Sequence, residues 1–340
     1  MSKVRFGIIG AGGWGEIHAQ IYSMYPFSEL IAVCDIREEK AEEVAKRYGI
    51  KKFYTDYRAL LSDNEIEAVA VVTPDFAHAE IAIAALESGK HLLLEKPMAK
   101  SVGDCERIIS AVEKSGTKFM VDFHNRWNPP FVKAKRSLDK GELGKVRLIY
   151  SRLNDTIFVP TEMLSWADRS SPLWFVGSHS IDTIMWFLGD RVTRVYSVSR
   201  SEVLSSMGIE TPDFYEIVME LEGGAVAVVE NCWLLPNSSP NIVDVKFEAI
   251  GDRGVVYIDV ARHRALEKYT ESGGSYPDVL VIPEIYGKPQ GFAAESIRHF
   301  VDCVAFDREP LVGLRDGLEV TRVIVAAERS AATGAPVELG

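Results

Sequence analysis

A glycine-rich turn near the N-terminus constrains the fold of this chain more than any other stretch. The apolar run at residues 4–9 is typical of a β-strand, and Gly10, Gly12 and Gly15 follow it at the spacing G-x-G-x-x-G. Gly10 allows a tight turn, Gly12 lets the backbone approach a pyrophosphate, and Gly15 lets a helix pack closely on the strand. The N–H groups at the start of that helix would point at the phosphates. Gly13 and Trp14 complete the motif.

The next predicted strand, residues 30–35, strengthens this interpretation because it ends in a carboxylate. Asp35 lies twenty positions after Gly15, where a dinucleotide fold needs an acid to hold the adenosine ribose hydroxyls. A glycine turn followed by an ordinary helix-capping aspartate is the competing explanation. Asp35 favours NAD, whereas Arg37 leaves NADP open, since it could stack on adenine or meet a 2′-phosphate.

Composition sets the class of protein. A length of 340 residues predicts about two domains, and 47% hydrophobic with 26% charged residues matches an ordinary globular protein. The net charge of −11 argues against nucleic acid or an anionic membrane as partner. The four cysteines lie far apart, which suggests neither a metal site nor a disulfide framework. With no membrane-length apolar run and no signal-peptide pattern, we expect a cytoplasmic enzyme.

Strands and helices alternate along the first part of the chain. Apolar strand-like runs at 68–73, 91–94 and 118–123 are separated by helical patterns at 77–88 and 101–114. This alternation predicts a doubly wound parallel sheet. We therefore expect an α/β fold whose N-terminal Rossmann domain spans residues 1–124.

The pattern changes after about Val146. Six segments are strand-like: 146–153, 192–199, 214–221, 225–233, 243–250 and 254–261. Helical stretches are expected at 178–188, 291–307 and 316–332. Apolar and acidic residues alternate in 214–221, as in a sheet with one covered face. We expect residues 125–340 to form an α+β domain with a mostly antiparallel sheet, whose C-terminal tail could pack back on the first domain.

The sequence resembles the glucose–fructose oxidoreductase / inositol dehydrogenase / MocA (Gfo/Idh/MocA) family over essentially its whole length. The matching residues are the glycine motif, Asp35, Thr73–Pro74 with His78, Glu95–Lys96–Pro97, the stretch from Gly177 through His179 and Asp182 to Gly189, and a closing helix that begins near Asp316. The resemblance implies hydride transfer between NAD(P) and a carbinol carbon of a sugar, inositol or related polyol. It also implies that the sheet of the second domain is large and open, and that the protein forms a homo-dimer or homo-tetramer through that open sheet.

Lys96 is the first candidate catalytic residue. It lies just beyond the predicted strand 91–94, in the crevice where open α/β sheets bind ligands. Oxidising an alcohol requires removal of the hydroxyl proton as hydride leaves the carbon. A lysine beside a cationic nicotinamide and partly out of water can have its pKa lowered toward neutrality. Glu95 could orient it. A surface lysine before a proline is the alternative, and the resemblance favours a catalytic role.

His179 and Asp182 are three positions apart at a predicted helix start, so both side chains can face one cleft. The family places a histidine here to contact the reacting hydroxyl, and Asp182 would bind substrate beside it. A hydrogen-bonded core histidine is the alternative.

Phe175 departs from the family pattern. Many polyol dehydrogenases of this family carry an aspartate four residues before that histidine, and here the position is Phe175. Either Lys96 and His179 suffice, or another acid such as Asp182 or Asp168 takes over, or catalysis has been lost. Trp174 and Phe175 could instead form an apolar wall against a sugar face.

The remaining candidates follow other predicted strands. Arg126 comes after the strand 118–123 and could reach substrate oxygens, or simply anchor its loop. Trp14 and Phe76 could line the nicotinamide side or belong to the core. The resemblance adds Thr73, Pro74, His78 and Glu95 to the cofactor-binding set.

These observations together predict an NAD-dependent oxidoreductase of a sugar, inositol or related polyol, with no metal. Two alternatives stay open. One is an enzyme that holds NAD tightly and oxidises a sugar only transiently, as in epimerisation or eliminative glycoside cleavage. The other is a cofactor-binding regulator without turnover.

Overall fold

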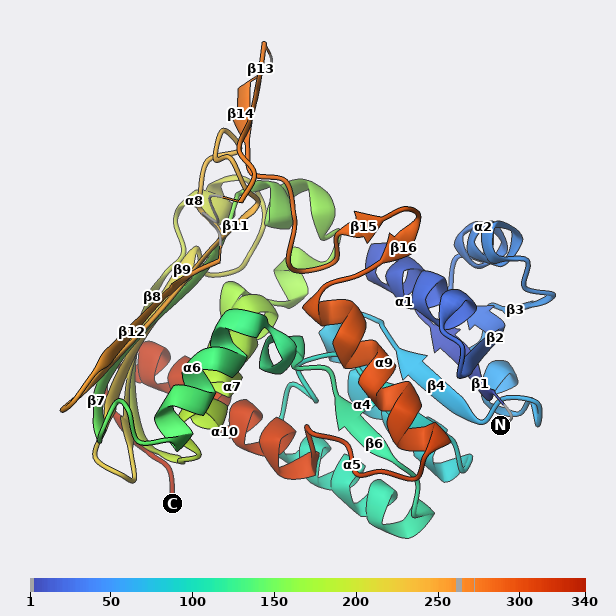
Figure 1. Ribbon diagram of the computed structural model, residues 1–340, viewed down its shortest axis with the longest axis horizontal. Helices are drawn as coiled ribbons and strands as arrows, with labels where there is room; N and C mark the ends of the chain where they lie inside the picture. The colour runs from blue at the N-terminus through green and yellow to red at the C-terminus, as the bar shows by residue number, and fades with distance from the viewer. Residues whose placement is uncertain (1–2, 261–264, 272) are drawn as a thin grey trace. The chain divides into compact units, whose positions relative to one another are not determined.

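The computed structural model describes residues 3–260, 265–271 and 273–340, which form two compact units (Figure 1). The first unit contains the chain up to His124 together with Leu280–Leu318, and the second contains Asn125–Val279 with Glu319–Gly340. Residues 280–318, which lie in the predicted domain 125–340, cluster with the first unit. The predicted domain bounds, with a C-terminal tail that could pack back on the first domain, stay a prediction.

The first unit is built on a six-stranded parallel sheet with the order β3-β2-β1-β4-β5-β6. Its strands are β1 (Val4–Ile9), β2 (Ser28–Cys34), β3 (Lys52–Tyr54), β4 (Ala68–Val71), β5 (His91–Leu94) and β6 (Phe119–Val121). The chain moves outward from β1 in both directions, so the strand order reverses between β1 and β4, where such sheets bind ligands. The predicted doubly wound parallel sheet is confirmed.

Helices cover this sheet. They are α1 (Gly13–Met24), α2 (Glu38–Tyr48), α3 (Tyr57–Leu61), α4 (His78–Glu87), α5 (Val102–Ser115) and α9 (Phe292–Ala305), with the 3₁₀ turn η1 (Asp75–Ala77) before α4 and the short hairpin β15 (Glu284–Ile285)–β16 (Lys288–Pro289) before α9. Helices α1 and α9 contact each other and strand β1, while α4 and α5 contact each other. Helices α2 and α5 end at Gly49 and Gly116, both in the left-handed conformation that glycine tolerates.

The second unit is built on a seven-stranded sheet with the order β12-β11-β7-β10-β9-β8-β17. Its strands are β7 (Val146–Asp155), β8 (Val192–Arg200), β9 (Phe214–Leu221), β10 (Val226–Cys232), β11 (Val243–Gly251), β12 (Val255–Asp259) and β17 (Val337–Glu338). Among these pairings β7 and β10 run parallel and the others antiparallel, which confirms the predicted open, mostly antiparallel sheet. Residue 261, the end of the strand predicted at 254–261, lies outside the described residues.

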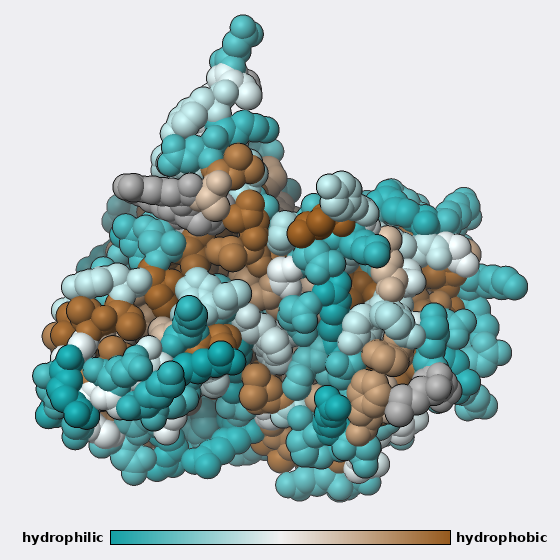
Figure 2. Space-filling model, in the orientation of Figure 1, coloured by the Kyte–Doolittle hydropathy of each residue, from teal (hydrophilic) through white to brown (hydrophobic). Residues whose placement is uncertain are grey.

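One face of this sheet is covered and the other is open. Figure 1 shows α6 (Pro129–Asp139), α7 (Ser178–Leu188) and the second-unit part of α10 (Leu314–Thr333) on the same side of the sheet. In β9, Tyr215, Ile217, Met219 and Leu221 are buried, whereas Glu216, Val218 and Glu220 are exposed. Figure 2 shows an apolar surface at the edge where β7 and β12 lie, and Tyr257 on β12 is 70% exposed.

Shorter elements complete the second unit. They are the 3₁₀ turn η2 (His124–Trp127, which begins at the last residue of the first unit), the π-helical turns η3 (Val159–Met163) and η5 (Leu173–Gly177), the 3₁₀ turn η4 (Ala167–Arg169), α8 (Val203–Ser206) and the hairpin β13 (Lys268–Thr270)–β14 (Gly273–Ser275). No helix among the described residues is both long and apolar enough to span a membrane.

Candidate functional site

The glycine turn after β1 has the shape of a phosphate cradle. Gly10 has φ +107°, and a Cβ atom there would overlap the carbonyl oxygen of Val72. A Cβ at Gly15 would overlap the carbonyl oxygen of Gly10, so α1 packs closely on the turn. A Cβ at Gly12 or Gly13 would meet nothing within 4 Å, which leaves open space at the first turn of α1. Exposed N–H groups and open space together fit a dinucleotide pyrophosphate.

The Asp35 carboxylate is held in place after β2. Its Oδ2 accepts the Ala11 N–H at 2.8 Å and its Oδ1 accepts the Arg37 N–H at 2.9 Å. The Arg37 Nε lies 3.6 Å from the same Oδ1. Each oxygen keeps a further lone pair, and the fixed carboxylate can accept hydrogen bonds from a ribose diol. This arrangement fits the adenosine end of NAD.

His78 joins two of the predicted cofactor loops. At the start of α4 it is 1% exposed, with Nδ1 2.7 Å from the Pro97 carbonyl oxygen and Nε2 2.9 Å from the Thr73 carbonyl oxygen. Burial lowers the pKa of His78, and a neutral ring can donate to one of these oxygens at a time. The loop after β4, with Pro74 and the half-buried Phe76, is thereby tied to the turn after β5.

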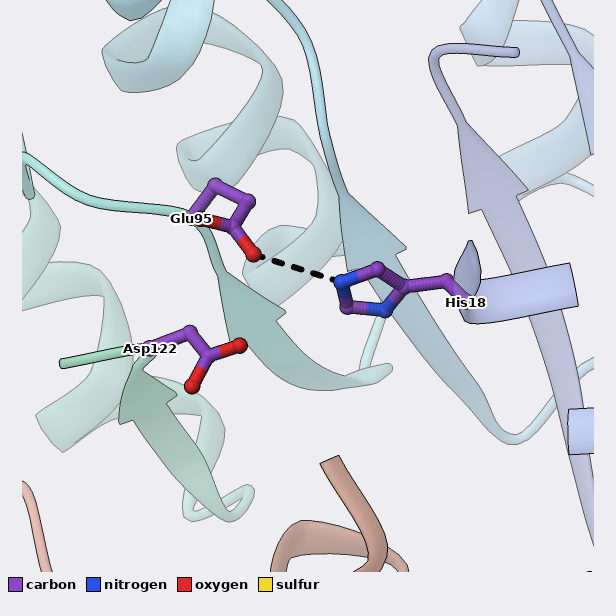
Figure 3. Close-up of side chains that lie close together, drawn as sticks. All are labelled: His18, Glu95 and Asp122. Carbon is purple, nitrogen blue, oxygen red and sulfur yellow. Dashed lines mark hydrogen bonds and ion pairs between the residues drawn. The ribbon is translucent and has the colours of Figure 1, made fainter. Parts of the chain in front are cut away.

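Glu95 is buried at the end of β5 and receives two side chains from α1. Its Oε1 accepts the Trp14 indole N–H at 2.7 Å and lies 3.2 Å from the His18 Nε2 (Figure 3). Burial raises the pKa of Glu95, and the neighbouring Lys96 ammonium opposes that shift. Lys96 itself is half-buried. The predicted base therefore sits next to a fixed, buried carboxyl group.

Sequence reasoning missed the groups behind Glu95. Asp122 is fully buried after β6, and its pKa is raised well above the ordinary value by burial and by Glu95. Burial lowers the pKa of His18 to about 4 and that of His124 to about 3. His18 lies four residues after Trp14 on the same helix face, which is a signal that the sequence offers, whereas Asp122 falls inside the predicted strand 118–123.

His18, Glu95 and Asp122 each offer an atom within 4.8 Å of the others, and Figure 3 shows them pointing toward one another. Three such groups can in general hold a metal ion. Here, however, the indole N–H of Trp14 and the ring of His18 already engage the Glu95 oxygen. We interpret the group as a hydrogen-bonded proton cluster, and the predicted absence of a metal stays a prediction.

His179 lies at the start of α7 in the second unit and is 7% exposed. The helix start is packed tightly on β10, because a Cβ at Gly177 would lie 2.7 Å from the Asn231 Oδ1. The Asn231 amide donates to the Leu153 carbonyl oxygen at 2.9 Å and lies 3.3 Å from the Ser180 hydroxyl. The backbone that carries His179 is therefore fixed by Gly177 and Asn231, and of these two residues the sequence analysis named only Gly177.

Arg126 and Asp182 form a buried, bidentate ion pair. The Arg126 Nε donates to Oδ2 at 3.0 Å and its Nη2 donates to Oδ1 at 2.5 Å, and the side chains are 5% and 1% exposed. The charged groups of both predicted substrate residues are thus directed at each other. Their role in substrate binding stays a prediction. Asp168, the other acid considered, is exposed in η4.

Trp174 and Phe175 point into different surroundings. Trp174 is 2% exposed and donates its indole N–H to Glu328 on α10 at 2.7 Å. The half-buried Phe175 has ring centroids of Trp166 and Trp233 at 6.2 and 6.0 Å. This aromatic cluster, Phe175, Trp166 and Trp233, packs on buried residues that include Leu204. Phe175 therefore belongs to an aromatic cluster one turn before His179, Trp174 is buried against α10, and the predicted role of both in binding substrate stays a prediction.

Comparisons with known proteins agree with this geometry. Residues 4–123 match the model of the "Oxidoreductase family, NAD-binding Rossmann fold", and residues 131–257 match the "GFO/IDH/MocA C-terminal domain". The chain is 29% identical to the scyllo-inositol 2-dehydrogenase (NAD(+)) of Bacillus subtilis, over 99% of this chain and 96% of the relative. It is 26% identical to the myo-inositol 2-dehydrogenase of Thermotoga maritima, over 96% of each.

A solved structure is similar throughout. The scyllo-inositol dehydrogenase from Lactobacillus casei, with bound NAD(H) and scyllo-inositol, matches with a TM-score of 0.85 at 22% identity over 99% of both chains. At this identity the likeness shows the fold.

Proposed function

Because the chain belongs to the GFO/IDH/MocA family of NAD-binding oxidoreductases, we propose that it oxidises a carbinol carbon of an inositol or a closely related cyclic polyol. The observation that carries this proposal is the pairing, in one unit, of a dinucleotide cradle with Lys96 at the carboxyl end of β5. The dehydrogenase names of the relatives support oxidation over transient oxidation or regulation without turnover.

The reaction needs a hydride acceptor and a base. When bound, NAD accepts the hydride, that is, the carbon-bound hydrogen with both electrons of the C–H bond. The substrate oxygen loses its proton as the C=O bond forms, and the Lys96 amine takes that proton and becomes an ammonium. Glu95, fixed by Trp14 and His18, provides a negative charge beside the ammonium that forms.

His179 is proposed to contact the same hydroxyl. Its helix start is held by the close approach of Gly177 to Asn231, which limits the positions that the imidazole can take. The Arg126–Asp182 ion pair, one turn further along α7, restrains the helix. Because the Asp182 carboxylate is paired with Arg126, this proposal does not use it as the missing acid. In this proposal Lys96 and His179 suffice for proton transfer.

Phe175 is proposed to face the substrate's apolar side. Cyclic polyols present axial C–H groups on one face of the ring, and an aromatic surface can bind that face. The edge-to-face contacts of Phe175 with Trp166 and Trp233 fix its ring. A substrate with its charged or highly polar groups turned away from this wall is therefore favoured.

The open face of the second sheet is proposed to mediate a homo-dimer or homo-tetramer in the cytoplasm. Tyr150, Val218 and Tyr257 are exposed on its strands among charged residues such as Arg152 and Glu216. Apolar exposure of this kind favours self-association. Light scattering at micromolar concentration tests it, and a monomeric mass would contradict it.

A substrate screen tests the proposed function. Reduction of NAD and of NADP is followed with a panel of inositol isomers, sugars and sugar acids. The proposal expects turnover of at least one inositol or cyclic polyol with NAD, and loss of that turnover in Lys96→Ala but not in Lys114→Ala, an exposed lysine on α5. Binding of NAD without turnover of any member would contradict the proposal.

A further inference from the structure

Asp122 is a buried carboxyl group that the proposed reaction does not use. Its backbone N–H donates to the Leu94 carbonyl oxygen at 2.8 Å, which places it beside the end of β5 where Glu95 and Lys96 follow. The Ser296 hydroxyl, on α9, donates to its Oδ1. Within the described part of the chain no N–H or O–H group donates to its buried Oδ2, and the Glu95 side chain lies within hydrogen-bond reach of Asp122. One oxygen of this carboxyl group is therefore fixed, while the other is left inside the cluster.

The titratable and polar side chains around Asp122 come from four segments. Glu95 and Lys96 follow β5, His18 and Tyr22 lie on α1, His124 follows β6, and α9 contributes the neutral Ser296. Both histidines are neutral at pH 7, because burial lowers their pKa values to about 4 and about 3. Two ionised carboxylates here would be close like charges without a matching second cation from these segments. Such pairs hold one proton between them.

We propose that Asp122 is a positioning residue for Lys96: it remains a neutral carboxylic acid and shares its proton with Glu95, so that the pair carries one negative charge. This inference rests on the proposed function of Lys96. His18 supports the same arrangement, because its neutral ring can donate from Nε2 to Glu95 while Nδ1 accepts the Tyr22 hydroxyl at 3.2 Å. Glu95 then receives several neutral donors and keeps a fixed orientation behind Lys96.

The single charge matters for the base. A second negative charge behind Lys96 would stabilise its ammonium form. The fall in rate at low pH, which is the acid limb of the pH profile, would then begin at a higher pH. A neutral Asp122 avoids this, while its proton orients Glu95. The protonated form of Asp122 thus helps Lys96 to accept a proton near neutral pH.

Two substitutions separate these effects. Asp122→Asn is neutral, can donate to Glu95 and can accept from Ser296, so kcat should stay within about threefold and the acid limb of the pH profile should not move. Asp122→Leu loses the donor, so kcat should fall roughly tenfold to a hundredfold with a shifted acid limb, the scale for losing one hydrogen bond to a charged group. NAD affinity by calorimetry should stay unchanged in both. Asp307→Asn, an exposed acid of the same unit, is the control.

Infrared spectroscopy provides a readout that is independent of turnover. The wild-type protein at neutral pH should show the carbonyl stretch of a buried protonated carboxylic acid, and Asp122→Asn should lack it. That comparison stands even if Asp122→Leu does not fold. Absence of the band, a shifted acid limb in Asp122→Asn, or a bound divalent ion in the purified protein that is lost in Asp122→Asn would each overturn the proposal.

Failure of the proposed function would look different. If the wild-type protein shows the band but oxidises no polyol, proton sharing is established and the positioning role is rejected together with the dehydrogenase. If polyols are oxidised and an Asp122→Leu protein that folds keeps its kcat and pH profile, Asp122 is only structural and the positioning role alone is rejected.

Discussion

The imidazole Nδ1 of His78 lies 2.7 Å from the carbonyl oxygen of Pro97, which ties the start of α4 to the turn that carries Lys96. The other ring nitrogen lies 2.9 Å from the Thr73 carbonyl oxygen. His78 is therefore buried between two loops and is expected to fix their position. Its place in the cofactor-binding set stays a prediction.

Removing the His78 ring should loosen both loops. His78→Ala leaves the buried Pro97 carbonyl oxygen and the part-buried Thr73 carbonyl oxygen without this partner, so we expect the free energy of unfolding to fall by about 1–3 kcal/mol. We expect kcat to fall as well, because Lys96 follows the loosened turn. His78→Gln can still donate to one carbonyl and should recover part of both losses. Denaturant unfolding and steady-state kinetics measure these effects. A His78→Ala protein as stable and active as the wild type would show that the ring is dispensable.

The buried ion pair of Arg126 and Asp182 gives a sharper stability prediction. Arg126→Met leaves the Asp182 carboxylate buried without its guanidinium, which should cost about 3–5 kcal/mol of unfolding free energy. The double variant with Asp182→Leu removes the orphaned charge and should be more stable than Arg126→Met alone. Tryptophan fluorescence during denaturant unfolding reports both values. If the single variant is the more stable of the two, the pair is not a buried charge pair in solution.

His18 should make the stability of the first unit sensitive to acid. Burial lowers its pKa from 6.5 to about 4, so between these pH values the unfolded chain binds a proton that the folded chain does not. Stability from this group is therefore present above pH 6.5 and is lost as the pH falls toward 4, by about 3 kcal/mol in total. His18→Gln does not titrate and should lack this contribution. Unfolding free energies of both proteins at pH 7 and pH 4.5 test it, and identical pH dependence would contradict it.

The fold was predictable where the signal is local. The glycine spacing after β1 and the apolar runs that became β4 and β5 each lie within a few residues of sequence, and they indicate a parallel sheet without further information. The alternation of buried and exposed residues in β9 equally predicts a sheet covered on one face. The NAD-binding domain and a sheet with one covered face followed from such patterns, whereas the family and its large open sheet followed from the resemblance of the motifs. All of these are confirmed.

The site was predictable only in part, because its contacts join distant segments. The predicted strand 118–123 extends past β6, which ends at Val121, so the prediction places Asp122 inside the strand and not beyond its carboxyl end. Ser296 reaches Asp122 from α9, 174 positions away in the chain, and no local pattern marks such a pair. Arg126 and Asp182 are both predicted to bind substrate, and no local sequence pattern indicates that their charged groups also form a buried ion pair.

Cofactor preference should depend on Asp35. Both of its oxygens are oriented by backbone N–H groups, and the carboxylate would repel a 2′-phosphate while accepting hydrogen bonds from a 2′-hydroxyl. We expect the wild-type protein to bind NAD more tightly than NADP. Asp35→Ser should shift the ratio of the two affinities toward NADP, with Arg37 available to the phosphate. Calorimetric titration with both cofactors measures the ratio, and tighter NADP binding by the wild type would contradict the assignment.

The most direct test of the central claim is kcat and NAD affinity measured together for Lys96→Ala, with Lys114→Ala as the matched control. The cradle at Gly10–Gly15 and the Asp35 carboxylate do not include Lys96, so NAD affinity should change little. Loss of a general base typically lowers kcat about 10²–10⁴-fold, equivalent to roughly 3–5 kcal/mol of barrier. The account predicts that drop with cofactor binding intact. Wild-type kcat in Lys96→Ala, on the substrate that the screen identifies, would contradict it.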